Sequence, residues 1–323
     1  MDLYQIVFQT VVVFVAALFA PLLSLLYFRR VRLERPALGV FNTRDILLIL
    51  VFILSLPFLY LILPSYVLTG MLALTFSTAL YIALHPFLRA RYLWPLVAFL
   101  IVGDIVVTRT LMGTTQGWQI YWVFNNIIVL GAAVGISNLY VQGGMHMRQV
   151  AWFSLILACY DFFFDIVVPV SAHLADRFHG QPMDAAMGWI SGPYSSNLGI
   201  GDILVFSLFI ISAYKGFGRR GLFASVGVII LCGAILPSLS PLVILPFVRG
   251  GIGITIPVQT FFGPFAVLTY YLLRRGGPER SMAQWFRAEA EEGYEPIRVS
   301  RRRRAVAPAA APSLVKAGTG QGD

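Results

Sequence analysis

GIGDILVFSLFIISAYKG, residues 199–216, is the stretch that decides the fold. It is an apolar run close to the length of about 20 residues that a helix needs to cross a bilayer, and it holds one carboxylate, Asp202. The chain of 323 residues is 58% hydrophobic and 12% charged, which excludes a soluble domain and indicates a polytopic membrane protein. A carboxylate at bilayer depth costs about 2.5–3.5 kcal/mol, so Asp202 is a candidate functional residue.

Nine apolar stretches of this kind predict an all-α membrane protein, a nine-span helical bundle. The second stretch passes into the third at Pro64-Ser65-Tyr66, which predicts a tight helical hairpin. The eighth stretch holds prolines at 237, 241 and 246, which predict a kink. The stretches are residues 5–28, 45–64, 66–86, 93–112, 118–141, 149–170, 199–216, 221–247 and 252–273.

The basic residues alternate between the connections. Those after the first, third, fifth and seventh stretches hold most of the Arg and Lys residues outside the tail, and the other connections hold few. By the positive-inside rule this predicts an outside N-terminus and a cytoplasmic C-terminus. We expect a multi-pass protein of a prokaryotic plasma membrane. The net charge of +9 therefore reports topology and anionic lipid, and predicts no nucleic-acid partner.

The chain divides into two membrane parts and a tail: spans one to five in residues 1–148, spans six to nine in 149–273, and a mostly disordered, basic, cytoplasmic tail in 274–323. Within the tail, residues 281–292 predict a short amphipathic helix with Trp285 and Phe286 resting on the bilayer. Arg301–Arg304 are predicted to contact anionic lipid. The alternative is a solvated tail with no specific role.

A second aspartate, Asp161, lies in the predicted sixth span. With the orientation above, span six runs outward and span seven inward, which places Asp161 and Asp202 about 13 and 6 Å below the outer edge. Span nine enters from the same side with Pro257-Val258-Gln259 at a similar depth. Three features distant in sequence are therefore predicted to meet in one layer.

Each feature also has a purely structural interpretation. An intramembrane aspartate is sometimes only an interhelical hydrogen-bond partner. Gly199 and Gly201 beside Asp202 would allow close helix packing. Pro257 at the start of a span is ordinary for the first turn of a helix. The combination is far more specific than its parts.

These residues carry a family resemblance. Tyr160-Asp161, Gly199-Ile200-Gly201-Asp202 and Pro257 resemble the Tyr-Asp, Gly-x-Gly-Asp and Pro-Ala-Leu motifs on spans six, seven and nine of the intramembrane aspartyl proteases, the presenilin and signal peptide peptidase family. Trp122–Ile127 in span five and the outside N-terminus look like the signal peptide peptidase branch. The resemblance covers residues 118–273. It implies that Asp161 and Asp202 are catalytic, supported by Tyr160, Gly199, Gly201, Pro257, Val258 and Gln259.

The implied activity is hydrolysis of peptide bonds within membrane segments. Two carboxyls in a low-dielectric site hold one proton between them, so one activates a water while the other protonates the scissile carbonyl. The expected partners are transmembrane segments of substrate proteins or signal peptides, together with the lipid bilayer. Neither a metal nor another cofactor is expected. The connection 171–198 can lend an extended strand to a substrate helix, which must unwind before cleavage.

Two departures from the family pattern stand out. The third motif reads Pro257-Val258-Gln259, with a polar Gln near the expected pair. Asp165 lies one turn above Asp161 and on the same face, as a gate residue or a third acid. A catalytically inactive homologue that binds membrane segments is therefore one alternative.

A proton-coupled membrane carrier is the other alternative, with Asp104, Asp161, Asp165 and Asp202 as relay sites. The lack of an internal repeat disfavours it. Val102-Gly103-Asp104 imitates only half of the span-seven motif. We therefore expect a structural role for Asp104, paired with Arg109.

Overall fold

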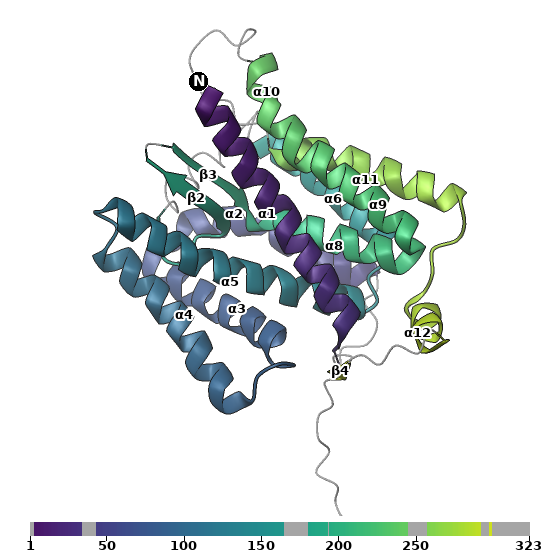
Figure 1. The fold of residues 1–323 in the computed structure, drawn as a ribbon, viewed down its shortest axis with the longest axis horizontal. Coiled ribbons are helices and arrows are strands. Elements are labelled where there is room, and N and C mark those ends of the chain that lie inside the picture. The colour runs from purple at the N-terminus through teal and green to yellow at the C-terminus, as the bar shows by residue number, and fades with distance from the viewer. Residues whose placement is uncertain are drawn as a thin grey trace, which may run out of the picture.

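The computed structural model describes residues 3–33, 43–164, 180–192, 194–244, 257–291 and 297–298. The described chain is mostly helical, with two small two-stranded sheets (Figure 1). The α-helices are α1 Leu3–Arg30, α2 Thr43–Ile62, α3 Ser65–Leu84, α4 Ala90–Thr110, α5 Thr115–Gln142, α6 Met147–Phe162, α8 Ile200–Phe217, α9 Arg219–Val228, α10 Leu236–Ile244, α11 Val258–Arg275 and α12 Met282–Glu291; η2 Ile229–Ile235 is a π-helix.

The strands form one parallel and one antiparallel pair. β1 Val31–Arg32 pairs in parallel with β4 Ile297–Arg298. β2 Ala186–Ser191 and β3 Tyr194–Gly199 form an antiparallel hairpin in which Ala186 faces Gly199. The hairpin lies in the connection predicted between spans six and seven, so the all-α expectation holds for the membrane part and misses this sheet.

Six helices in the described ranges are long and apolar enough to cross a membrane, which makes this a membrane protein. They are Tyr4–Arg30, Ser65–Leu84, Ala90–Thr110, Thr115–Gln142, Ile200–Phe217 and Arg219–Ser240. The other three predicted spans coincide with helices α2, α6 and α11. The apolar part of α2 is Leu47–Ile62, and α6 has 16 residues before the described segment ends in a short π turn. The count of nine spans stays a prediction.

The helices pack closely where small residues allow it. α1 crosses between one group formed by α6, α9 and α11 and another formed by α3, α4 and α5 (Figure 1). A Cβ on Gly263 of α11 would lie 2.6 Å from the Ala158 Cβ and 2.7 Å from the Ser154 carbonyl of α6. On α8, Phe206 and Phe209 place their rings 4.6 and 5.2 Å from that of Phe262. The three helices predicted to carry the site therefore share one core.

Irregular backbone appears in the eighth predicted span, where the prolines predict a kink. The π-helix η2 joins α9 to α10 and ends two residues before Pro237. Gly233 in η2 lies against Phe206, because a Cβ there would be 2.7 Å from the ring. A π turn displaces the helix backbone, and such turns are a common cause of kinks in helices.

The segment after α11 folds back onto the bundle. We call residues 276–291 the strap, the bundle end beneath it the strap end, and the opposite end, at β2–β3, the hairpin end. The predicted amphipathic helix is present as α12, but its predicted bilayer contact is wrong for Trp285. This side chain is only 6% exposed, with its ring 5.8 Å from Phe28 and 5.0 Å from Tyr214. Protein rings cover Trp285 in place of lipid, and Arg301–Arg304 lie outside the described residues.

Candidate active site

One cavity of about 800 Å³ collects most of the residues that the sequence singles out. Its walls come from α2, α6, α8 and the start of α11, and are mainly aliphatic and aromatic. The predicted site residues that line it are Tyr160, Asp161, Gly199, Gly201, Asp202 and Gln259. The two aspartates, 41 positions apart in the sequence, thus face the same space.

Asp161 is the penultimate residue of α6 and is half-buried. Its neighbour Tyr160 donates a hydrogen bond to the Leu54 carbonyl of α2, 3.3 Å away, and its ring packs at a tilt against that of Phe164, with the centroids 4.4 Å apart. Tyr160 therefore ties α6 to α2 across the wall of the cavity. Asp165, the predicted third acid, lies outside the described residues.

Asp202 lies in the first turn of α8, immediately after the hairpin. Gly199 ends β3 and serves as the N-cap of α8. The Asp202 Oδ2 lies 3.5 Å from where a Cβ on Gly199 would stand, and a Cβ on Gly201 would meet nothing within 4 Å. A Cβ would therefore meet the carboxylate at an ordinary van der Waals distance at Gly199, and it would meet open space at Gly201.

Gln259 contributes a carboxamide that has no hydrogen-bond partner in the described part of the chain. It is the second residue of α11 and 1% exposed, and neither Nε2 nor Oε1 is hydrogen-bonded. An unsatisfied buried amide costs about 1–3 kcal/mol. Pro257 is the N-cap of α11 and Val258 packs on the core; of the third motif, Gln259 alone lines the cavity where the chain is described.

The hairpin is held on α5 by two consecutive asparagines. Asn126 pairs with Gly188 as a strand would: its Nδ2 donates to the carbonyl at 2.8 Å, and its Oδ1 accepts from the N–H at 2.9 Å. Asn125 donates to the Ala186 carbonyl at 2.6 Å. In the sequence, these asparagines contribute only to the family resemblance. Two amides inside a span were the signal that could have indicated a buried polar partner.

The predicted ion pair between Asp104 and Arg109 is wrong. Asp104 is fully buried, and its Oδ2 accepts a hydrogen bond of 2.6 Å from the Met183 backbone N–H. Arg109 is five residues further along α4, about 140° round the helix and 7.5 Å along its axis. Asp104 thus has a structural role as predicted, but it holds the segment before β2.

Asp184 adds a second acid to this anchorage. It is 8% exposed, and the hydroxyl of Tyr121 contacts both its carboxyl group and, at 3.3 Å, the Gln181 carbonyl. The pKa of Asp184 is raised to about 7: burial raises it most and the negative charge of Asp104 adds to the rise, while hydrogen bonds from Gly180 and Tyr121 oppose it.

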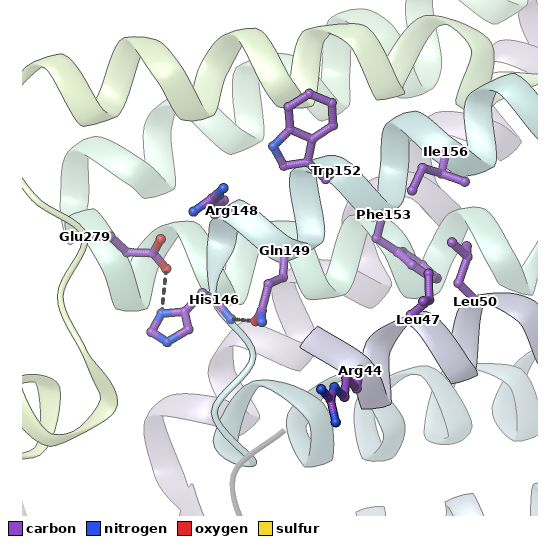
Figure 2. A pocket seen from close by; sticks show the side chains of 10 residues that line it. All are labelled: Arg44, Leu47, Leu50, His146, Arg148, Gln149, Trp152, Phe153, Ile156 and Glu279. Atoms are coloured by element: carbon purple, nitrogen blue, oxygen red, sulfur yellow. Dashed lines mark hydrogen bonds and ion pairs between the residues drawn. The ribbon is translucent and has the colours of Figure 1, made fainter. Parts of the chain in front are cut away.

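Charged groups link α8 and the start of α6 to the strap at the strap end. Lys215 of α8 is fully buried and donates to the Met145 carbonyl. The Glu279 Oε1 accepts from the Met147 backbone N–H at 2.7 Å and lies 3.4 Å from His146 Nδ1 (Figure 2). Burial alone would raise the pKa of Glu279, but these bonds and the charge of Lys215 lower it overall. This cluster was not predicted from the sequence, although a lysine inside a predicted span was a signal for it.

Comparison of the chain with models of known protein families and with curated proteins finds no match in either set. Within the described ranges, no group of three or more His, Cys, Asp or Glu side chains could hold a metal ion. The chemistry of the site is therefore argued from two carboxylates and one free carboxamide in an apolar cavity.

Proposed function

We propose that this protein is an intramembrane aspartyl endopeptidase of the presenilin and signal peptide peptidase type, with Asp161 and Asp202 as its catalytic residues. The observation that carries the proposal is the cavity itself: two carboxylates from different helices line one largely apolar space of about 800 Å³. Carboxylates at this depth are expensive, and a pair facing one space is suited to general acid–base chemistry.

The reaction follows from a pair that holds one proton. The ionised aspartate takes a proton from water as the water oxygen bonds to the scissile carbonyl carbon, and the protonated aspartate gives its proton to the carbonyl oxygen. The resulting diol then collapses: the first aspartate protonates the leaving nitrogen as the C–N bond breaks, and the second recovers a proton from the diol. The pair ends with one proton, and no covalent intermediate with the protein forms.

Substrate binding is assigned to groups that lack partners of their own. A membrane helix satisfies its backbone internally and must unwind before water reaches an amide. Gln259 offers donors and an acceptor for the exposed peptide groups, and Gly201 leaves room for a backbone beside Asp202. The hairpin, which runs directly into α8, supplies an extended neighbour for the unwound strand.

The proposal includes the topology predicted from the sequence: nine spans in a prokaryotic plasma membrane, the hairpin end outside and the strap end in the cytoplasm. The site would then open toward the outer face and act on transmembrane segments or signal peptides with cytoplasmic N-termini. Labelling of single cysteines at positions 2 and 310 in intact cells tests this topology. Labelling of position 310 alone by an impermeant reagent would reverse it.

A cleavage assay in liposomes with a generic single-span peptide tests the activity. Asp161→Asn and Asp202→Asn should each reduce cleavage to below a few per cent while the protein still inserts and folds. The matched control is Asp104→Asn, which keeps an acceptor for the Met183 N–H and should leave cleavage largely intact. Full activity in Asp161→Asn would reject the assignment.

An inactive homologue that binds membrane segments is the second candidate, favoured by Gln259 in the third motif. Its signature would be a wild-type protein that does not cleave, with activity gained only in Val258→Ala/Gln259→Leu.

A further inference from the structure

A second cavity, of about 610 Å³, lies between the first turns of α2 and α6, beside the strap (Figure 2). Its lining is Arg44, Leu47, Leu50, His146, Arg148, Gln149, Trp152, Phe153, Ile156 and Glu279. Phe153 also lines the cavity that holds Asp161 and Asp202. The polar residues that line the second cavity have no role in the proposed reaction.

The polar side of this cavity carries uncompensated positive charge. Arg44 and Arg148 are both exposed, and neither is paired with an acid where the structure describes the chain. Glu279 does not neutralise them, because its carboxylate is already held by His146 and the Met147 N–H. Gln149 uses its Oε1 to accept from the His146 N–H, which leaves its two amide hydrogens for a ligand.

The other side of the cavity is apolar and open. Leu47, Trp152 and Ile156 are 59, 41 and 39% exposed, and the buried Leu50 and Phe153 lie behind them. Figure 2 shows Glu279, His146, Arg148 and Gln149 toward the strap, the aliphatic side chains away from it, and Arg44 beside Leu47 at the start of α2. Since α2 and α6 are among the helices expected to span the bilayer, exposed apolar groups on them face acyl chains.

We infer that this cavity binds one anionic phospholipid. The headgroup phosphate pairs with Arg44 and Arg148, since guanidinium groups bind phosphate oxygens bidentately. One acyl chain lies along Leu47, Trp152 and Ile156. The net charge of the two arginines favours a headgroup with a net negative charge over a zwitterionic one. Two other occupants of the cavity are disfavoured. A soluble anion would leave the apolar wall uncovered, and the basic tail at Arg301–Arg304 would be repelled by the two arginines.

Native mass spectrometry of the purified full chain, with phosphatidylglycerol or phosphatidylcholine of identical acyl chains, tests the inference. One phosphatidylglycerol should be retained in preference to phosphatidylcholine. Arg44→Ala/Arg148→Ala should weaken its retention about thirtyfold. The matched control, Arg219→Ala/Arg220→Ala, removes two exposed arginines predicted on the same membrane face and should retain the lipid as wild type does.

Two further measurements distinguish a lipid from a soluble anion, and loss of the site from loss of the fold. Inorganic phosphate at the same concentration should not compete; equal competition would overturn the lipid in favour of a soluble anion. Arg44→Lys/Arg148→Lys keeps the charge and should retain most of the preference, which remains readable if the alanine pair fails to fold. The proposed site would be contradicted if wild type retained both lipids equally, or if the control pair lost the lipid as much as Arg44→Ala/Arg148→Ala does.

Discussion

The two ends of α8 are anchored by different kinds of interaction. At the hairpin end, which carries Asp202, the anchors are hydrogen bonds that Asn125 and Asn126 donate to backbone carbonyls and one that Asp104 accepts from a backbone N–H. At the strap end, Lys215 and Glu279 are buried charges bridged by backbone groups. The first kind of anchor is short and directional but can be remade one bond at a time. The charged anchor is lost as a whole when one partner is removed, because the remaining charge is then buried without compensation. The difference suggests a rigid base for α8 and an adjustable end beside the aspartates.

The largest effect is expected from breaking the strap end. Glu279→Gln leaves Lys215 buried without an opposing charge and should destabilise the fold by about 3–5 kcal/mol. Thermal unfolding in detergent measures the loss. Lys215→Met/Glu279→Gln removes both charges and should recover much of the stability. If the double variant is no more stable than Glu279→Gln, the charges do not act as a pair.

A smaller effect on stability, with a larger one on function, is expected at the hairpin end. Asn126→Ala removes both bonds to Gly188 and should cost about 1–3 kcal/mol. Hydrogen exchange of residues 186–199 should accelerate, and cleavage should fall while most of the fold persists. The control is Ser55→Ala, an exposed residue of α2 whose hydroxyl bonds only within its own helix. Unchanged exchange in Asn126→Ala would show that the asparagine does not hold the hairpin.

The two ends should also respond to pH in opposite directions. The pKa of Asp184 is raised to about 7 from 3.8, so the unfolded chain loses this proton first as the pH rises. Its stabilising contribution is complete below about pH 4 and is lost by about pH 7. The pKa of Glu279 is lowered from 4.5, so its contribution is present above that pH and is lost below it. The protection of the hairpin amides against hydrogen exchange, corrected for the intrinsic pH dependence of exchange, should fall between pH 4 and 8 in wild type and stay flat in Asp184→Asn. A wild-type profile in the variant would assign the response to another group.

An effect on stability of the opposite sign is expected between the ends, at Gln259. Gln259→Leu removes an unsatisfied buried amide and should raise stability by about 1–3 kcal/mol. If the amide binds substrate backbone, KM should rise while kcat changes little. Liposome cleavage kinetics give both constants. An unchanged KM would leave Gln259 without a role in substrate binding.

The sequence predicts what depends on periodicity and on residue type. Helices occupy the described parts of all nine apolar stretches. Of the motif residues that were expected together, Pro257 and Val258 do not line the cavity, and those that do are Tyr160, Asp161, Gly199, Gly201, Asp202 and Gln259. The partner of Asp104 was missed because a backbone N–H has no signature in a sequence. The hairpin was missed because its strands are short and rich in Gly and Ser, and Trp285 because an amphipathic face fits a protein groove as well as a bilayer.

The burial of Lys215 has a consequence for how the protein is made. Its opposing charge, Glu279, lies 64 residues later, after two further predicted spans. At about 5–20 residues per second, roughly 3–13 s of synthesis separate the two residues. Throughout that interval α8 holds a cation with only the Met145 carbonyl beside it. During synthesis, Lys215 of α8 must therefore stay near water, lipid headgroups or the insertion machinery until the segment that carries Glu279 has been made. Packing of α8 into the bundle is then a late step in biogenesis.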